Sequence, residues 1–147
     1  QSRGLGDVYK RQGMCKGPAD MDDFRMKFDS LEEQQEDPDS IYNYVKQVIR
    51  VRNQNPVIAR GTTAYLEQYS GEQCFALTRS YEGSNLLLLG NTSAEAVSVD
   101  LTGLTVGGTT AEELVLLGEL YTGEETAERA GTVVTLPAYS ILILGEE

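Results

Sequence analysis

The sequence lacks histidine altogether and contains only two cysteines among its 147 residues. The absence of histidine excludes a Ser-His-Asp triad, a Cys-His pair and every metal site with a histidine ligand. Cys15 and Cys74 lie far apart and outside any C-x-x-C spacing. They are therefore either two free thiols or one disulfide, and they indicate no cellular compartment. We expect no cofactor and no metal site.

Basic clusters and long apolar segments are also missing. Twelve lysine and arginine residues stand against 23 aspartate and glutamate residues, which gives a net charge of −11. Such a surface repels phosphate backbones and anionic lipids, so neither nucleic acid nor a membrane is an expected partner. The longest apolar run, Leu86 to Leu89, is far too short to cross a bilayer.

Paired acidic residues occur at three places, Glu32-Glu33, Glu112-Glu113 and Glu124-Glu125. Adjacent side chains point in different directions on any regular element, so these pairs make poor acid/base couples and are better explained as surface charge. The sequence has no EF-hand spacing, P-loop or G-x-G-x-x-G motif. A hydrophobic content of 40% and a charged content of 24% are ordinary for one soluble globular domain with its own core.

The first twelve residues show neither a helical nor an alternating pattern. The string from Ser2 to Gln12 resembles a translated sequencing adapter, and we interpret residues 1–12 as a non-native tail that replaces the true upstream sequence. The alternative is a disordered native tail. With either interpretation these residues carry no chemistry and give no information about export.

One helix is predicted, after a loop-like stretch from Gly13 to Asp37. Asp39 or Ser40 is a good N-cap, and Asn55-Pro56 ends the helix. Five apolar side chains form one helical stripe: Ile41, Tyr44, Val45, Val48 and Val51. One helix cannot bury its own stripe. Either the following domain covers it or a larger upstream structure does, and the loop before the helix favours the second alternative.

After Pro56 the period changes to that of short strands separated by turns. The predicted strands are Thr63–Tyr69, Gln73–Tyr81, Asn85–Asn91, Ala96–Leu101, Leu114–Leu117, Thr132–Leu136 and Tyr139–Leu144. This pattern predicts a mainly β fold, an antiparallel, Greek-key-like β-sandwich of about seven strands preceded by one α-helix. Leu86 to Leu89 has no polar alternation, so its strand is predicted to be central and covered on both faces. The domain boundary is expected near Pro56–Gly61.

The segment from Asp37 to Gly61 closely resembles the last barrel helix of α-amylase-family glycoside hydrolases. That helix has the pattern S-x-x-N-x-Y/V-x-x-x-I-x-x-R-x-x-x-P and leads into a C-terminal β-domain; the matching residues here are Ser40, Asn43, Ile49, Arg52 and Pro56. Gly13-Met14 resembles the end of the family's strand-eight motif. Leu86 to Leu101 and Leu136 to Leu144 resemble a hairpin and the closing strand of its C-domain.

The resemblance implies three parts: residues 1–12 as a non-native tail, 13–56 as the end of a (β/α)8 catalytic barrel, and 57–147 as the C-terminal sandwich. In the family the catalytic carboxyl groups come from barrel strands upstream of Gly13, so no catalytic residue is expected here. Phe24-Arg25-Met26-Lys27 resembles the strand-four motif Phe-Arg-x-Asp, but Lys27 occupies the position of the nucleophile.

The implied parent is a retaining glycosidase of carbohydrate metabolism that hydrolyses starch-like α-glucans or oligosaccharides. This part would cap and stabilise the barrel and would be inactive alone. Its expected partners are the missing barrel and an α-glucan, and a bacterial-type, extracytoplasmic parent is mildly preferred. The alternatives are a free-standing carbohydrate-binding module, with Tyr65, Tyr69 or Tyr81 as a platform, and a structural interaction domain.

Three places carry weaker functional signals. Arg25 would lie in a loop at the rim of the barrel's active-site face, where it either contacts substrate or holds the loop by an ion pair. Tyr65 and Tyr69 are predicted on one face of a strand, as a sugar-stacking platform or as partly buried sandwich aromatics. Asn91-Thr-Ser93 matches a glycosylation sequon, which matters only in a secreted eukaryotic chain.

Overall fold

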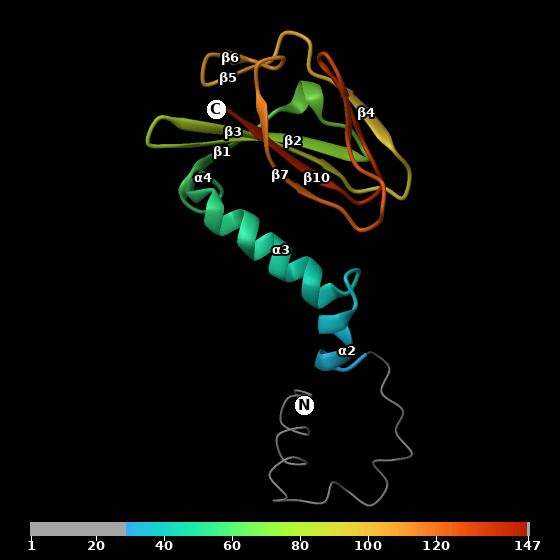
Figure 1. Cartoon of the computed structure of the whole chain (residues 1–147). Coiled ribbons are helices and arrows are strands. Elements are labelled where there is room, and N and C mark those ends of the chain that lie inside the picture. The colour runs from blue at the N-terminus through green and yellow to red at the C-terminus, as the bar shows by residue number, and fades with distance from the viewer. Residues whose placement is uncertain (1–28, 147) are drawn as a thin grey trace, which may run out of the picture. The chain divides into compact units, whose positions relative to one another are not determined.

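The computed structural model of the chain describes residues 29–146 (Figure 1). The chain divides into two compact units, Gln1–Asn43 and Tyr44–Glu147. The expected non-native tail, Gly13-Met14 and Arg25 lie outside the described residues, as does Cys15. The three-part division that the sequence suggests, with a boundary near Pro56–Gly61, stays a prediction.

The described part of the first unit contains a short helix, α2 (Leu31–Glu36). Ser30 and Glu33 form a capping box: the Glu33 backbone N–H donates to Ser30 Oγ at 3.3 Å, and the Ser30 N–H donates to the Glu33 carboxylate at 2.7 Å. The prediction of a loop was therefore wrong for residues 31–36. The S-x-x-E sequence at Ser30 was the available signal, although too few apolar residues follow it to form a helical stripe.

Ser40 and Asn43 join the end of α2 to the start of the next helix, α3 (Ile41–Gln54). Ser40 is the N-cap, because its Oγ accepts the Asn43 backbone N–H at 3.2 Å. The Asn43 side chain turns back and donates to the carbonyls of Gln34, Gln35 and Asp37 at 3.0, 3.3 and 2.7 Å. Of the two predicted N-caps, Ser40 is confirmed. Both residues belong to the α-amylase-like pattern, and the side chains of both form hydrogen bonds with backbone groups.

The predicted end of the helix at Asn55-Pro56 is confirmed. The Asn55 side chain donates to the Val51 carbonyl at 2.9 Å, and Pro56 is the first residue of a further short helix, α4 (Pro56–Arg60). Gly61 follows α4 at a close approach to the sandwich, since a Cβ there would lie 3.1 Å from the backbone nitrogen and oxygen of Ser80 in β2. The chain then enters the sheets directly.

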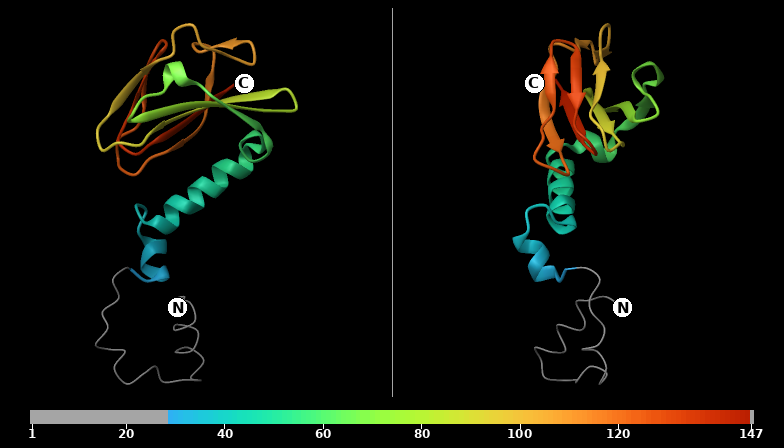
Figure 2. Two further views of the ribbon diagram at one scale, coloured as in Figure 1. Left: turned by 180° about the vertical axis from the view of Figure 1, so that it is seen from behind. Right: turned by 90° about the vertical axis from the view of Figure 1, so that its right-hand side faces the viewer.

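Ten strands form three antiparallel sheets in the described residues (Figures 1 and 2). The strands are β1 (Thr62–Tyr65), β2 (Cys74–Tyr81), β3 (Ser84–Asn91), β4 (Val97–Asp100), β5 (Thr105–Val106), β6 (Thr109–Thr110), β7 (Val115–Leu120), β8 (Glu128–Ala130), β9 (Val133–Leu136) and β10 (Ile141–Gly145). The five-stranded sheet has the order β1-β2-β3-β10-β7, the three-stranded sheet β4-β9-β8, and β5 pairs with β6. The predicted β-sandwich preceded by a helix is confirmed.

The individual strands differ from the prediction in two ways. The strand predicted at Thr63–Tyr69 ends at Tyr65, and a 3-10 helix, η2 (Glu67–Tyr69), follows it. The short strands β5, β6 and β8 were not predicted, because two or three residues are too few to display a period of two. β8 is an edge strand of the three-stranded sheet, and β5 and β6 form a separate two-stranded sheet.

The β2–β3 hairpin lies at the centre of the fold. Its turn residues Glu82 and Gly83 both have positive φ, +50° and +88°, as a tight hairpin turn requires. β3 lies between β2 and β10, and Leu87 and Leu89 are fully buried on one face while Leu86 is 4% exposed on the other. The predicted central strand, covered on both faces, is confirmed.

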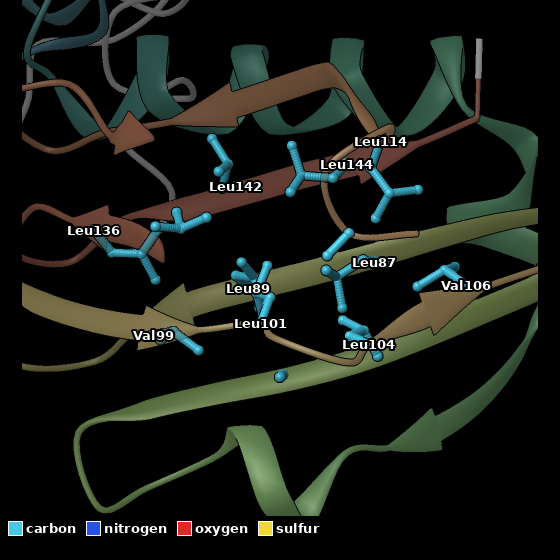
Figure 3. Close-up of a cluster of buried hydrophobic side chains, with 13 residues drawn as sticks. Leu87, Leu89, Val99, Leu101, Leu104, Val106, Leu114, Leu136, Leu142 and Leu144 are labelled. Carbon is cyan, nitrogen blue, oxygen red and sulfur yellow. The ribbon is translucent and has the colours of Figure 1, made fainter. Parts of the chain in front are cut away.

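The main core fills the space between the five-stranded and the three-stranded sheet (Figure 3). Leu87, Leu89 and Leu142 enter it from the larger sheet, and Val99 and Leu136 enter it from the smaller one. Each of these five side chains is at most 5% exposed. Their burial in a continuous apolar cluster is the main source of stability available to the second unit.

A second, smaller cluster lies on the outer face of the five-stranded sheet. Val51 of α3 and Val57 of α4 are buried there with Leu86, Leu120 and Ile143 of the sheet. Gly118 of β7 makes room for the helix, because a Cβ at that position would lie 3.0 Å from Val51 Cγ1. The sandwich therefore covers part of the helical stripe, where the sequence favoured an upstream structure.

Candidate functional site

Helix α3 has one covered side and one uncovered side within the second unit. Tyr44 and Val48 pack against the outer-face cluster together with the buried Val51. Val45 and Ile49, one helical turn apart, remain 47% and 51% exposed. Ile41, the first residue of α3, is 76% exposed. We call Val45 and Ile49 the exposed helix strip; it is an apolar surface on the same helix whose other side is already packed.

Arg79 of β2 joins α4 and the edge strand β1 to the middle of the larger sheet. Its guanidinium donates to the carbonyls of Val57 and Gly61 at 3.2 and 2.6 Å and to Thr63 Oγ1 at 2.7 Å. A planar guanidinium can satisfy three acceptors in one plane, whereas an ammonium cannot reproduce that arrangement. Arg60, at the end of α4, lies 6.0 Å above the ring of Tyr81. These contacts tie both ends of the α4–β1 connection to β2.

The two predicted platform tyrosines are not brought onto one strand. Tyr65 ends β1 and is 60% exposed. Tyr69 belongs to η2, packs against the main core and donates its hydroxyl to the Thr102 carbonyl at 3.3 Å. The shared strand face on which the platform was predicted is therefore absent, since the strand ends before Tyr69. Of these two tyrosines, only Tyr65 has a ring that is largely exposed to solvent.

Phe75 is an aromatic residue that the sequence reasoning missed. The register pairs Tyr65 with Leu77, and Phe75 lies two residues before Leu77 in β2, so the three side chains share the outer face of the sheet. The Phe75 ring lies over Gly90 of β3, because a Cβ at Gly90 would come within 2.2 Å of it. The alternation of Phe75, Leu77 and Tyr81 in the sequence was the available signal. We call Tyr65, Phe75 and Leu77 the aromatic face.

Several carboxyl groups of the described residues serve local structure. Glu33 completes the capping box of α2. Hydrogen bonds from Thr102 and Thr132 lower the pKa of Asp100, and hydrogen bonds from Thr110 lower the pKa of Glu113. A general acid for glycoside hydrolysis needs a pKa raised by burial. Asp100 and Glu113 are shifted in the opposite direction.

The described residues contain no group of three or more histidine, cysteine or acidic side chains that could hold a metal ion. Cys74 is half-buried and forms no disulfide within residues 29–146. None of the described helices is both long enough and apolar enough to span a bilayer. The remaining candidate, Arg25, lies outside the described residues. Within residues 29–146, the exposed helix strip and the aromatic face are two surfaces on which apolar side chains are open to solvent.

No protein-family model matches the chain, and no curated protein sequence does either. Solved structures do match it. Amy13B of Eubacterium rectale is 36% identical with a TM-score of 0.75, and the match covers 91% of this chain and 25% of that one. This chain is related to the α-amylase family. The resemblance inferred from Ser40, Asn43, Ile49, Arg52 and Pro56 is confirmed.

Two further α-amylase-family structures share the fold. An α-amylase from H. orenii is 23% identical with a TM-score of 0.62, and the match covers 82% of this chain and 23% of that one. A variant of the trehalulose synthase MutB from Pseudomonas mesoacidophila is 25% identical with a TM-score of 0.60, covering 79% and 20%. The chain therefore spans a quarter or less of the length of each of these enzymes. It corresponds to one part of an α-amylase-family glycoside hydrolase.

Proposed function

We propose that this chain is the C-terminal part of a retaining enzyme that hydrolyses α-glucosidic bonds in starch or oligosaccharides. In this proposal residues 13–56 end the catalytic barrel, residues 57–147 form the domain that caps and stabilises it, and the chain alone is inactive. The exposed helix strip carries the proposal. α3 is already docked on the sandwich through Val48 and Val51, yet Val45 and Ile49 remain about half exposed. An apolar strip of this kind is typical of a helix that packs between two structures.

Inactivity is tested directly with starch and maltooligosaccharides. The purified chain should release reducing sugar no faster than buffer, because the proposal places the two catalytic carboxyl groups on barrel strands outside residues 13–147. The full-length α-amylase from H. orenii serves as the positive control for the assay. Sugar release that survives further purification and scales with the amount of chain would overturn the proposal.

The capping role is tested by a chimera in which the matched 91% of this chain replaces the matching quarter of Amy13B. We expect the chimera to fold and the substitution Ile49→Asp to destabilise it by about 2 kcal/mol or more, since it puts a charge into a packed interface. The same substitution in the isolated chain should have little effect, because Ile49 is exposed there. Gln47→Asp, at another exposed position of α3, is the matched control. Equal effects of Ile49→Asp in both settings would contradict a covered strip.

A glucan-binding surface is the second candidate function, and the aromatic face favours it. An open tyrosine ring beside a second aromatic side chain can stack on the apolar face of a sugar. Affinity electrophoresis in starch gels should show retardation that Tyr65→Ala and Phe75→Ala reduce. Tyr139→Ala is the control, because Tyr139 is similarly exposed, at 52%, and lies in the β9–β10 connection. Unretarded migration of the wild-type chain would exclude this candidate.

A further inference from the structure

Asn91, the acceptor residue of the sequon Asn91-Thr-Ser93, is buried at the end of β3 and is only 3% exposed. Its side-chain nitrogen donates to the carbonyls of Glu95, Leu136 and Pro137 at 2.7, 3.2 and 2.8 Å. Its side-chain oxygen accepts the backbone N–H and the hydroxyl of Ser93, each at 2.9 Å. Every polar atom of the carboxamide is therefore occupied in the folded sandwich.

The same side chain joins the two main sheets. β3 belongs to the five-stranded sheet, whereas Leu136 ends β9 of the three-stranded sheet. The Asn91 backbone N–H also donates to the Ser140 carbonyl at 2.8 Å, and the Tyr139 N–H donates to the Ser93 carbonyl at 3.1 Å. The sequon is thus held against the β9–β10 connection on both its first and its last residue.

N-linked glycosylation takes place at Asn91 Nδ2, the same atom that donates these hydrogen bonds. The reaction forms a bond from Asn91 Nδ2 to C1 of an oligosaccharide and breaks the bond from C1 to the diphosphate of a lipid carrier, and Nδ2 loses one proton. A glycosylated Nδ2 keeps a single hydrogen, so it cannot donate both to the Glu95 carbonyl and to the carbonyls of Leu136 and Pro137. A sugar at a side chain that is 3% exposed would also displace the backbone of residues 136–137. Leaving these buried carbonyls unpaired is costly.

We propose that Asn91 accepts an N-linked oligosaccharide only in the unfolded chain, and that glycosylation there and completion of the sandwich exclude each other. The order of synthesis makes the unfolded acceptor available. Leu136 and Pro137 follow Asn91 by 45 and 46 residues. At 5–20 residues per second this is a gap of roughly 2–9 s, during which the carbonyls that bury Asn91 do not yet exist.

The test uses the full-length chain with the substitution Glu124→Asn. This change creates a second acceptor, Asn-Glu-Thr, in the exposed loop between β7 and β8, so the same molecule contains a buried and an open sequon. The purified, folded chain is incubated with oligosaccharyltransferase and a lipid-diphosphate oligosaccharide, and site occupancy is measured by mass spectrometry. We expect occupancy at Asn91 to be lower than at position 124 by about a hundredfold or more, because Asn91 reacts only when the fold opens.

The second arm translates the same chain, with a cleavable targeting sequence in front, into endoplasmic-reticulum microsomes. Here both acceptors should be modified to within a few-fold of each other. Chains that carry sugar at Asn91 should be digested by trypsin as unfolded protein is, whereas chains that carry sugar only at position 124 should resist. Comparable occupancy of the two sites in the folded chain, or equal trypsin resistance of the two products, would overturn the proposal.

Discussion

The two faces of the five-stranded sheet differ in what covers them. On the inner face, Leu87, Leu89 and Leu142 are sealed by the chain's own second sheet. On the outer face, α3 and α4 cover Leu86 and Ile143, and α3 itself leaves its other side open. The inner face is covered within this chain, whereas the helix on the outer face keeps Val45 and Ile49 about half exposed. The comparison separates stability, which we assign to the inner face, from association, which we assign to the outer one.

The largest effect is expected from opening the inner face. Leu87→Ala removes a side chain that is fully buried in the centre of the core. We expect a loss of about 3–5 kcal/mol in the free energy of unfolding, from lost burial and the cavity left behind. Urea denaturation followed by circular dichroism measures it. Leu116→Ala, on the 53% exposed Leu116 of β7, should cost far less. Similar losses for the two variants would remove the distinction between a sealed and an open position.

A smaller effect is expected from separating α3 from the outer face. Gly118→Val places a branched side chain where even a Cβ would lie 3.0 Å from Val51 Cγ1. We expect a loss of about 1–3 kcal/mol from overpacking, together with faster amide hydrogen exchange in residues 44–54. Gly123→Val is the control, since a Cβ at Gly123 has no neighbour within 4 Å. Unchanged exchange in α3 of the Gly118 variant would show that the helix does not depend on this contact.

The exposed helix strip should contribute little to the isolated chain. Ile49→Gln is expected to change the free energy of unfolding by less than about 0.5 kcal/mol, because the side chain is already half in water. Its effect should appear in solubility, since a polar residue interrupts the apolar strip. Light scattering over a concentration series measures that change. A loss of stability as large as that of Leu87→Ala would place Ile49 in the core of this chain.

The smallest effect is expected at the surface carboxylate of Asp100. Hydrogen bonds from Thr102 and Thr132 lower the pKa of Asp100 in the folded state. The carboxyl group therefore loses its proton more readily in the folded chain than in the unfolded chain. The resulting stabilisation is present above the unfolded pKa and is lost as the pH falls through the folded pKa. Asp100→Asn should therefore flatten the decline in urea midpoint between about pH 5 and pH 3. An identical acid profile for the variant would assign that decline to other carboxyl groups.

Much of the architecture could be predicted because it follows from the local spacing of apolar residues and from the residues that begin or end each element. The apolar run from Leu86 to Leu89 identified a strand buried on both faces, and Ser40 together with Asn55-Pro56 marked the limits of α3. The family pattern pointed to the correct relatives. In each case the signal lies within a few residues of the element it describes.

Features that depend on distant residues could not be predicted in this way. Asn91 was predicted as the last residue of a strand and as part of a sequon, and only the carbonyls of Leu136 and Pro137 make it a buried link between sheets. Tyr69 was placed on a strand, yet it lies in a 3-10 helix, and its hydroxyl donates to the carbonyl of the distant Thr102. The division of the α3 stripe into a covered and an open side likewise needs the position of β7 and Gly118.

The interior position of β10 in its sheet has a consequence for folding during synthesis. β10 is the last strand in sequence order, yet it lies between β3 and β7. The β2–β3 hairpin can form as soon as it is synthesised, but the sheet cannot close until Ile141–Gly145 has left the ribosome. Until then two long apolar strands keep open edges, which favours aggregation. Without β10, β3 and β7 would have no common neighbour, so the five-stranded sheet would be divided at this point.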